Sequence, residues 1–187
     1  AGQAGRCLRM SGSGSDTIDL GTVTNVSLAS GSWTGGAWFK NVLGTGAWRT
    51  LFRSNANDHQ IIIESGSTRL GMYDNASGGA FRPCGTNLAP PAGEWHNVTA
   101  MGTGSVTRMY VDGVEQGVCD RKSSSDIRSI GNYFSGSQKF AEYLDEVRIA
   151  TVARSADWIW AEYATVASPD TFLRYWNAGP LSAPQIM

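Results

Sequence analysis

Long apolar runs are absent from this sequence of 187 residues, and charges of one sign do not gather in any segment. A helix that spans a bilayer needs about 18 or more consecutive apolar residues, so we predict no membrane insertion. Lys and Arg together number 15 against 16 Asp and Glu, which gives a formal net charge of −1. Without a basic patch, a nucleic-acid partner is not expected.

Cysteine is scarce, with Cys7, Cys84 and Cys119 alone in the chain. None of these residues has the paired C-x-x-C spacing of a zinc site. A bridge between Cys84 and Cys119 would close about 35 residues and would stabilise the fold by about 4 kcal/mol. Because the count is odd, we favour three free thiols. The compartment therefore stays open, with an extracellular, cell-surface or virion location favoured.

The acidic residues do not form the cluster that a glycoside hydrolase needs. Glu142 and Glu146 share a strand face, but four residues of strand separate them by about 13 Å. Retaining enzymes hold their two carboxyl groups about 5–5.5 Å apart. The sequence also has no Gly-x-Ser-x-Gly elbow, phosphate-cradling loop or His-rich metal motif. We therefore predict that the protein is not an enzyme.

Glycine is abundant, at 23 residues, and short strand-like runs recur between turn residues. This spacing is typical of an all-β sandwich or barrel. Asp112 and Gly113 separate two such runs and predict a two-residue hairpin, because both residues tolerate the positive φ of a type I′ turn. The predicted strands are Cys7–Met10, Thr17–Leu20, Gly36–Lys40, Arg49–Arg53, Gln60–Glu64, Thr68–Tyr73, Trp95–Met101, Val106–Asp112, Val114–Val118 and Phe140–Ala150.

One helix is predicted near the C-terminal end. Ser155 is a good N-cap, and the helix should end before Ser168 and Pro169. The buried stripe at helical spacing is predicted to be Ala156, Ile159, Trp160 and Tyr163. Residues 177–187 hold little pattern, so we divide the chain into a domain at 1–176 and a tail at 177–187.

The segment Tyr143–Ile149 places a charged pair inside a strand-like run. Side chains alternate along a strand, so Asp145 is predicted to share the inward face with Val147 and Ile149. A buried carboxylate without a partner is very costly. Asp145 should therefore meet a cation, an arginine or backbone N–H groups.

Several segments together resemble laminin G-like (LamG) domains of the concanavalin A-like lectin/glucanase superfamily. The resemblance covers roughly residues 7 to 165 and keeps the family's order. It implies an antiparallel jelly-roll β-sandwich of two sheets with one short C-terminal helix. The segments that carry it are Leu8–Gly12, Thr17–Gly21, Ala37–Lys40, Trp95–Ala100, Arg108–Gly113, Tyr143–Ile149 and Val152–Trp158.

The resemblance also implies a structural calcium ion between the N-terminal strand and the last strand, with Asp145 as one ligand. Calcium takes six to eight oxygen ligands, many of them backbone carbonyls. Many relatives carry an acidic residue where this chain has Ser11, which would weaken the site or shift it toward Asp16 or Asp19. The alternative is that Asp145 pairs with an arginine or with backbone donors.

Aromatic residues in loops are the candidates for ligand contact, because loops held by a rigid sandwich commonly carry recognition. Rings can stack on sugars while neighbouring polar groups bond to them. Trp38, Trp95 and Trp160 are instead predicted to be core residues. The predicted ligand-binding residues are Trp48, Asn57, Asp58, Tyr73, Asp74, Tyr133 and Phe134.

Three functions remain open from the sequence. The first is a non-catalytic recognition or adhesion module that binds glycans or a protein surface. The second is a structural decoration or assembly protein of a virus particle or cell surface, whose tail at 177–187 contacts neighbouring subunits. The third and weakest is a glycoside hydrolase, which would need two distant carboxylates to meet in space.

Overall fold

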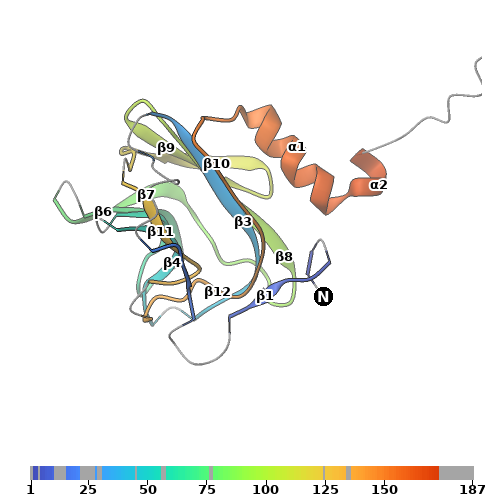
Figure 1. The fold of residues 1–187 in the computed structure, drawn as a ribbon, viewed down its shortest axis with the longest axis horizontal. Helices are drawn as coiled ribbons and strands as arrows, with labels where there is room; N and C mark the ends of the chain where they lie inside the picture. Colours follow the sequence, from blue (N-terminus) through green and yellow to red (C-terminus); the bar gives the residue numbers. More distant parts are fainter. Residues whose placement is uncertain are drawn as a thin grey trace, which may run out of the picture.

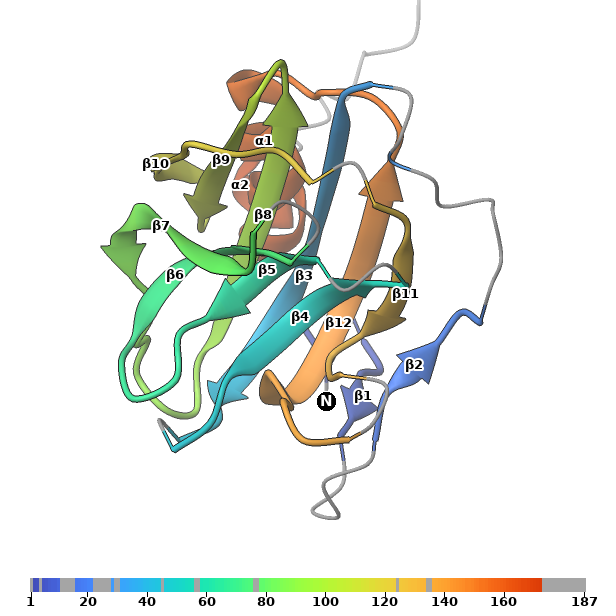
Figure 2. The same cartoon turned by 90° about the vertical axis from the view of Figure 1, so that its left-hand side faces the viewer.

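The computed structural model describes residues 2–3, 5–10, 16–21, 28, 31–44, 46–55, 58–75, 78–123, 125–133 and 136–172. These residues form two six-stranded antiparallel sheets that pack face to face (Figures 1 and 2). The first sheet has the order β1 (Leu8–Arg9), β12 (Ala141–Ala150), β3 (Trp33–Val42), β8 (Trp95–Thr103), β9 (Val106–Val111) and β10 (Val114–Cys119). The second has the order β2 (Ile18–Asp19), β11 (Ile127–Ile130), β4 (Arg49–Ser54), β5 (His59–Ile63), β6 (Arg69–Asp74) and β7 (Ala80–Asn87). The predicted all-β sandwich is confirmed.

The core fills the space between the two sheets. The long strands contribute side chains from their inner faces to it, as a sandwich requires. Trp33 is fully buried, and its indole N–H donates to the backbone carbonyl of Ser123 at 3.0 Å. The largest other buried side chains of this cluster are Leu28, Phe39, Leu51, Phe52, Ile61, Ile63, Leu70 and Phe140.

Strands β7 and β11 were not predicted from the sequence. Pro83 and Gly85 interrupt β7, which the sheet tolerates because β7 is an edge strand. Strand β11 has four residues, too few for an alternating pattern to be recognised. By contrast, the hairpin between β9 and β10 is confirmed, since Asp112 and Gly113 have φ values of 50° and 76°.

A disulfide bond joins Cys84 on β7 to Cys119 on β10. The prediction of three free thiols was therefore wrong for this pair, because an odd count leaves only one cysteine without a partner. Cys7 is a free thiol. The bond connects an edge strand of one sheet to an edge strand of the other.

The predicted inward orientation of Asp145 was wrong. Strand β12 contains a bulge after Asp145, where Glu146 has a φ of 47° and the register with β3 shifts. Asp145 pairs with Trp38, which faces outward and stacks on Tyr163 of the helix at 5.3 Å. Val147 still packs against the core. The extra residue therefore separates two positions that simple alternation would place on one face.

Helix α1 (Ala156–Ala167) lies against the outer face of the first sheet (Figure 1). As predicted, Ser155 is its N-cap, and its side chain accepts from the backbone N–H of Trp158. Ile159 is buried, but Ala156 is exposed and Trp160 is 52% exposed, so the predicted stripe was too wide. A helix that covers a sheet from outside buries only a narrow line of residues. A short helix, α2 (Pro169–Phe172), follows.

Neither described helix is long and apolar enough to cross a membrane.

Candidate ligand-binding cleft

A cleft of about 290 Å³ opens on the outer face of the second sheet. Strands β4, β5 and β6 form its floor, and the segment after β11 forms one side. The described residues that line it are Trp48, Arg53, His59, Ile62, Tyr73, Asn75, Tyr133 and Gln138.

Aromatic rings form one wall of the cleft. Trp48 meets Tyr73 edge to face, with 5.2 Å between ring centres, and also packs against Phe81 at 5.6 Å. The Tyr73 hydroxyl donates to the carbonyl of Gly79 at 3.1 Å. These contacts fix both rings while leaving them half-buried. A fixed, partly exposed ring can stack on a ligand with little loss of side-chain entropy.

A directional chain of hydrogen bonds crosses the floor. The Thr50 hydroxyl donates to the Oε1 atom of Gln138 at 2.8 Å, so it must accept from His59 Nδ1 at 2.9 Å. The other ring nitrogen, Nε2, then accepts from Arg53 Nε at 3.3 Å. One neutral tautomer of His59 satisfies both bonds.

Burial and the nearby Arg53 lower the pKa of His59 to about 3. The ring is therefore neutral at physiological pH and holds the tautomer that the chain needs. Thr50 also binds the Oε1 atom of Gln138. This bond fixes the Gln138 side chain, whose amide lines the cleft.

Arg53 is the charged residue of the described lining. Its guanidinium lies 3.6 Å from the centre of the Tyr133 ring, and the residue as a whole is 6% exposed. Burial lowers the pKa of Arg53 from its ordinary value, and the positive charge of Arg128 acts in the same direction. An arginine keeps its proton under such conditions. The cleft therefore presents a cation stacked on an aromatic ring.

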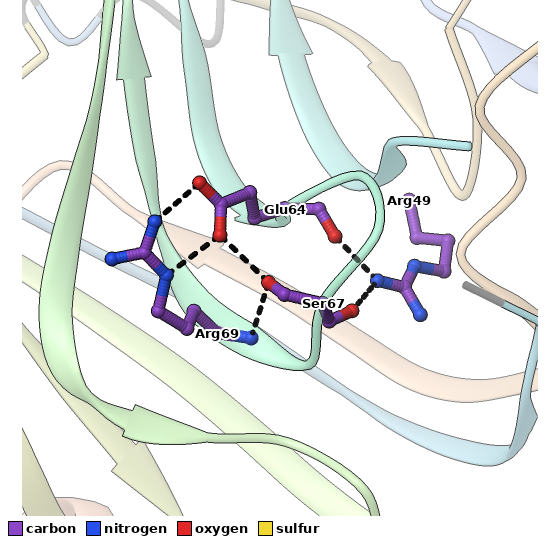
Figure 3. A network of polar contacts seen from close by, with 4 residues as sticks. All are labelled: Arg49, Glu64, Ser67 and Arg69. Atoms are coloured by element: carbon purple, nitrogen blue, oxygen red, sulfur yellow. Dashed lines mark hydrogen bonds and ion pairs between the residues drawn. The ribbon is translucent and has the colours of Figure 1, made fainter. Parts of the chain in front are cut away.

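A second arginine fixes the frame of the cleft beside Trp48. The Arg49 side chain is 2% exposed and donates to the carbonyls of Glu64, at 2.6 Å, and Ser67 (Figure 3). The Glu64 carboxylate in turn accepts from Arg69 at 2.6 and 2.5 Å and from the Ser67 hydroxyl at 2.7 Å. This network ties the turn between β5 and β6 to β4.

Three of the predicted ligand-binding residues, Trp48, Tyr73 and Tyr133, line this one cleft. Asp58 does not, because it is 3% exposed and accepts hydrogen bonds from the hydroxyls of Ser123 and Ser125. Asp74 is likewise buried, and its carboxylate lies 3.7 Å from Arg82 and 3.6 Å from Arg121. Neither acid is therefore a candidate contact for a ligand in this cleft. Asn57 and Phe134 lie outside the described residues.

Sequence reasoning missed Arg53 and Gln138, and it included His59 only as part of a polar loop at residues 55–59. Arg53 and His59 stand at the ends of adjacent strands, and Gln138, which bonds to Thr50, lies 88 residues from Thr50 in the sequence. The sequence holds a partial signal, since only Leu51 and Phe52 of the six residues of β4 are apolar. Polar residues in a strand indicate a polar outer face, but they do not identify which residues contact one another.

The predicted calcium ligands do not come together in the described part of the chain. Asp145 accepts from the backbone N–H of Glu146 at 2.9 Å, and Asp19 pairs with Arg128 at 3.3 Å. Asp16 accepts from the Asn132 amide through its backbone carbonyl. No group of three or more acidic, histidine or cysteine side chains suited to a metal occurs among the described residues, and Ser11 lies outside them. Calcium binding stays a prediction.

A second cleft, of about 200 Å³, lies between α1 and the first sheet. Arg148 fills part of its polar lining and bonds both to Glu146 at 2.6 Å and to Glu162 at 2.7 Å. The exposed ring of Trp158 lies at its edge beneath the guanidinium of Arg154, 4.5 Å away. The ion pairs of Arg148 satisfy its charge and those of Glu146 and Glu162, so this cleft is the weaker candidate.

Residues 12–160 match the sequence model of the concanavalin A-like lectin/glucanases superfamily. The chain belongs to this family. The match covers both sheets from β2 onward and the start of α1. The predicted family and the concanavalin A-like fold are thereby confirmed.

Solved structures with this fold include sugar-binding modules. The CBM40 of the Ruminococcus gnavus IT-sialidase, bound to α2,3-sialyllactose, matches with a TM-score of 0.60 and 13% identity over 84% of this chain and 96% of that one. Domain 4 of a Geobacillus stearothermophilus extracellular arabinanase, in complex with arabinotriose, matches with a TM-score of 0.55 and 16% identity over 74% and 69%. At these identities the likeness shows the fold alone.

A heptameric SAP-like pentraxin from Limulus polyphemus also matches, with a TM-score of 0.52 and 19% identity over 81% of each chain. In other matches the chain spans a smaller share, such as 43% of a protein from Bacteroides ovatus. No curated protein matches the sequence at a significant level.

Proposed function

We propose that the protein is a non-catalytic carbohydrate-binding module and that the cleft on the second sheet holds the glycan. The observation that carries this proposal is the aromatic wall of Trp48 and Tyr73 beside the polar floor of Arg53 and Gln138. A sugar ring has an apolar face and a polar rim. Rings that stack and polar groups that bond within one cleft match both features.

The related structures support this proposal. The Ruminococcus gnavus and Geobacillus stearothermophilus domains were each solved with an oligosaccharide. They share the sandwich but little sequence, so the same scaffold supports sugar recognition with different side chains.

The composition of the cleft supports a non-catalytic role. Glycoside hydrolysis by the common mechanisms uses two carboxyl groups that flank the scissile bond. The described lining contains no Asp or Glu side chain, and Asp58 and Asp74 are engaged by other residues. A bound glycan would therefore be held and not cleaved.

A glycan array tests the proposal. Wild-type protein should bind a subset of glycans, and the Trp48→Ala and Tyr73→Ala variants should each bind them on the order of tenfold less tightly. Trp158→Ala is the matched control, because Trp158 lines the other cleft and is 50% exposed. An array without hits, or hits that survive both cleft variants, would refute the proposal.

The predicted role in assembly depends on residues 177–187, which lie outside the described part of the chain. It stays a prediction.

A further inference from the structure

We propose that the cleft selects acidic sugars and that Arg53 pairs with the sugar carboxylate. This inference rests on the proposed glycan-binding function and specifies its ligand class. Uronic acids and sialic acids share the required chemistry, which is a planar carboxylate attached to a pyranose ring.

The balance of charge in the cleft favours an anion. Arg53 carries the one formal charge among the described residues of the lining. His59, with a pKa of about 3, adds none at neutral pH and accepts a hydrogen bond from Arg53. The positive charge of Arg128 also acts on Arg53 from nearby, although Asp19, at 3.3 Å from Arg128, offsets part of it. A negatively charged ligand is therefore attracted, and a cationic one repelled.

The orientation of the guanidinium is fixed before any ligand arrives. Its Nε atom is bonded to His59, and its face is stacked on Tyr133 at 3.6 Å. Two contacts in different directions define the plane of the group. Bidentate pairing with a carboxylate depends on such a plane, because both N–H···O bonds must be parallel to it.

The surroundings of Arg53 strengthen the pairing. The side chain is 6% exposed, and Tyr133, Tyr73 and Ile62 contribute apolar surface to the same cleft. The attraction between opposite charges is stronger in a site of low dielectric constant than on an open surface, and the fold has already removed most water from Arg53. The aromatic wall at Trp48 and Tyr73 would hold the sugar ring while its carboxylate meets the guanidinium.

Isothermal titration calorimetry with two matched probe pairs tests the inference. The first pair is 3′-sialyllactose and lactose, and the second is trigalacturonate and its methyl ester. In each pair the acidic sugar should bind wild-type protein at least about tenfold more tightly than its neutral counterpart. Binding in only the first pair would assign sialic acids, and binding in only the second would assign uronic acids.

The Arg53→Gln variant locates the effect. It should reduce binding of the acidic probe to the level of the neutral one. Arg108→Gln is the control, because it removes an equal charge from an exposed ion pair on the first sheet and should leave binding unchanged. The Arg53→Lys variant keeps the positive charge but lacks the planar pair of N–H donors. Its affinity for the acidic probe should therefore lie between those of wild type and Arg53→Gln.

The possible failures are distinguishable. Equal binding of the acidic and neutral probes by wild-type protein would overturn the inference and leave the glycan-binding proposal standing. Tight acidic binding that Arg53→Gln leaves intact would also overturn it. Array hits confined to neutral glycans would do the same, and an array without any hit would refute both proposals. The wild-type comparison decides the question even if a variant fails to fold.

Discussion

His59 is a buried side chain that orders the hydrogen bonds of the cleft and adds no charge to it at neutral pH. It links Arg53 to Thr50, and through Thr50 to Gln138, in one direction of hydrogen-bond donation. Its protonation would place two like charges side by side and would break the bond from Arg53, because Nε2 could no longer accept. The neutral ring is thus a positioning residue for the groups that face the ligand.

The pH dependence of stability tests this role. The folded pKa of His59, about 3, lies below the unfolded value near 6.5, so the unfolded state binds more protons between these limits. The stability contribution is complete above pH 6.5 and is lost as the pH falls. At pH 4.5 the loss is about 2 to 3 kcal/mol, from roughly two pH units at 1.36 kcal/mol each.

The His59→Gln variant lacks this titration and should show a flatter decline between pH 7 and pH 4.5 in urea unfolding experiments. Asp19 and Glu64, whose pKa values are lowered by hydrogen bonds, contribute equally in both proteins. Parallel declines in the two proteins would show that His59 is not held neutral.

Loop position indicated exposure correctly for three aromatic residues but not for Asp58 and Asp74, which are buried. Trp48, Tyr73 and Tyr133 were predicted in this way and line one cleft. Arg53 was not predicted, because its role depends on partners from other strands. Asp145 was predicted to face inward, and the bulge at Glu146 turned it outward. A local backbone conformation of this kind leaves no clear pattern in the sequence.

At the scale of elements, the strands with regular alternation and the helix with a capping residue were predicted well. Ser155 and the stop at Ser168 define α1 within a residue of the prediction. The contacts of the helix were harder, since only tertiary packing decides that Tyr163 stacks on Trp38 while Trp160 stays exposed. Edge strand β7 lacked a pattern because an edge tolerates Pro83 and glycine.

The N-cap of α1 offers a test at this scale. The Ser155→Ala variant removes the hydrogen bond from the Trp158 backbone N–H to the Ser155 hydroxyl, which is 3.2 Å long. The free energy of unfolding should fall by about 1 kcal/mol. Ser155→Asp retains an acceptor at the cap and should stay close to wild type. Urea unfolding monitored by circular dichroism measures both, and equal stability of the Ala variant would contradict the assigned cap.

At the scale of the whole molecule, the two sheets form one body whose outer faces differ. Helix α1 lies on the side of the first sheet (Figure 2), whereas the second sheet carries the cleft. The sandwich could be predicted from the family resemblance, because the strand motifs of the family occur in this sequence in the same order. The location of the cleft could not be predicted, since it requires knowledge of which loops meet above the second sheet.

The Cys84–Cys119 bond, which joins the two sheets at one edge, provides a test at this scale. Replacing both cysteines with alanine opens a link with a sequence separation of 35 residues. The free energy of unfolding should fall by about 4 kcal/mol on the chain-entropy model. Cys7→Ala, which removes only the free thiol, should change it by less than about 0.5 kcal/mol. A double variant as stable as wild type would contradict the bridge.

The central claim is that glycans bind in the cleft on the second sheet. The seven tryptophan indole N–H groups give separate reporters for a nuclear magnetic resonance titration. With 3′-sialyllactose or trigalacturonate as the probe, we predict a saturable shift of the Trp48 indole signal while that of Trp158 stays in place. Indole signals that all remain stationary with both probes, or a shift of Trp158 in place of Trp48, would contradict the claim.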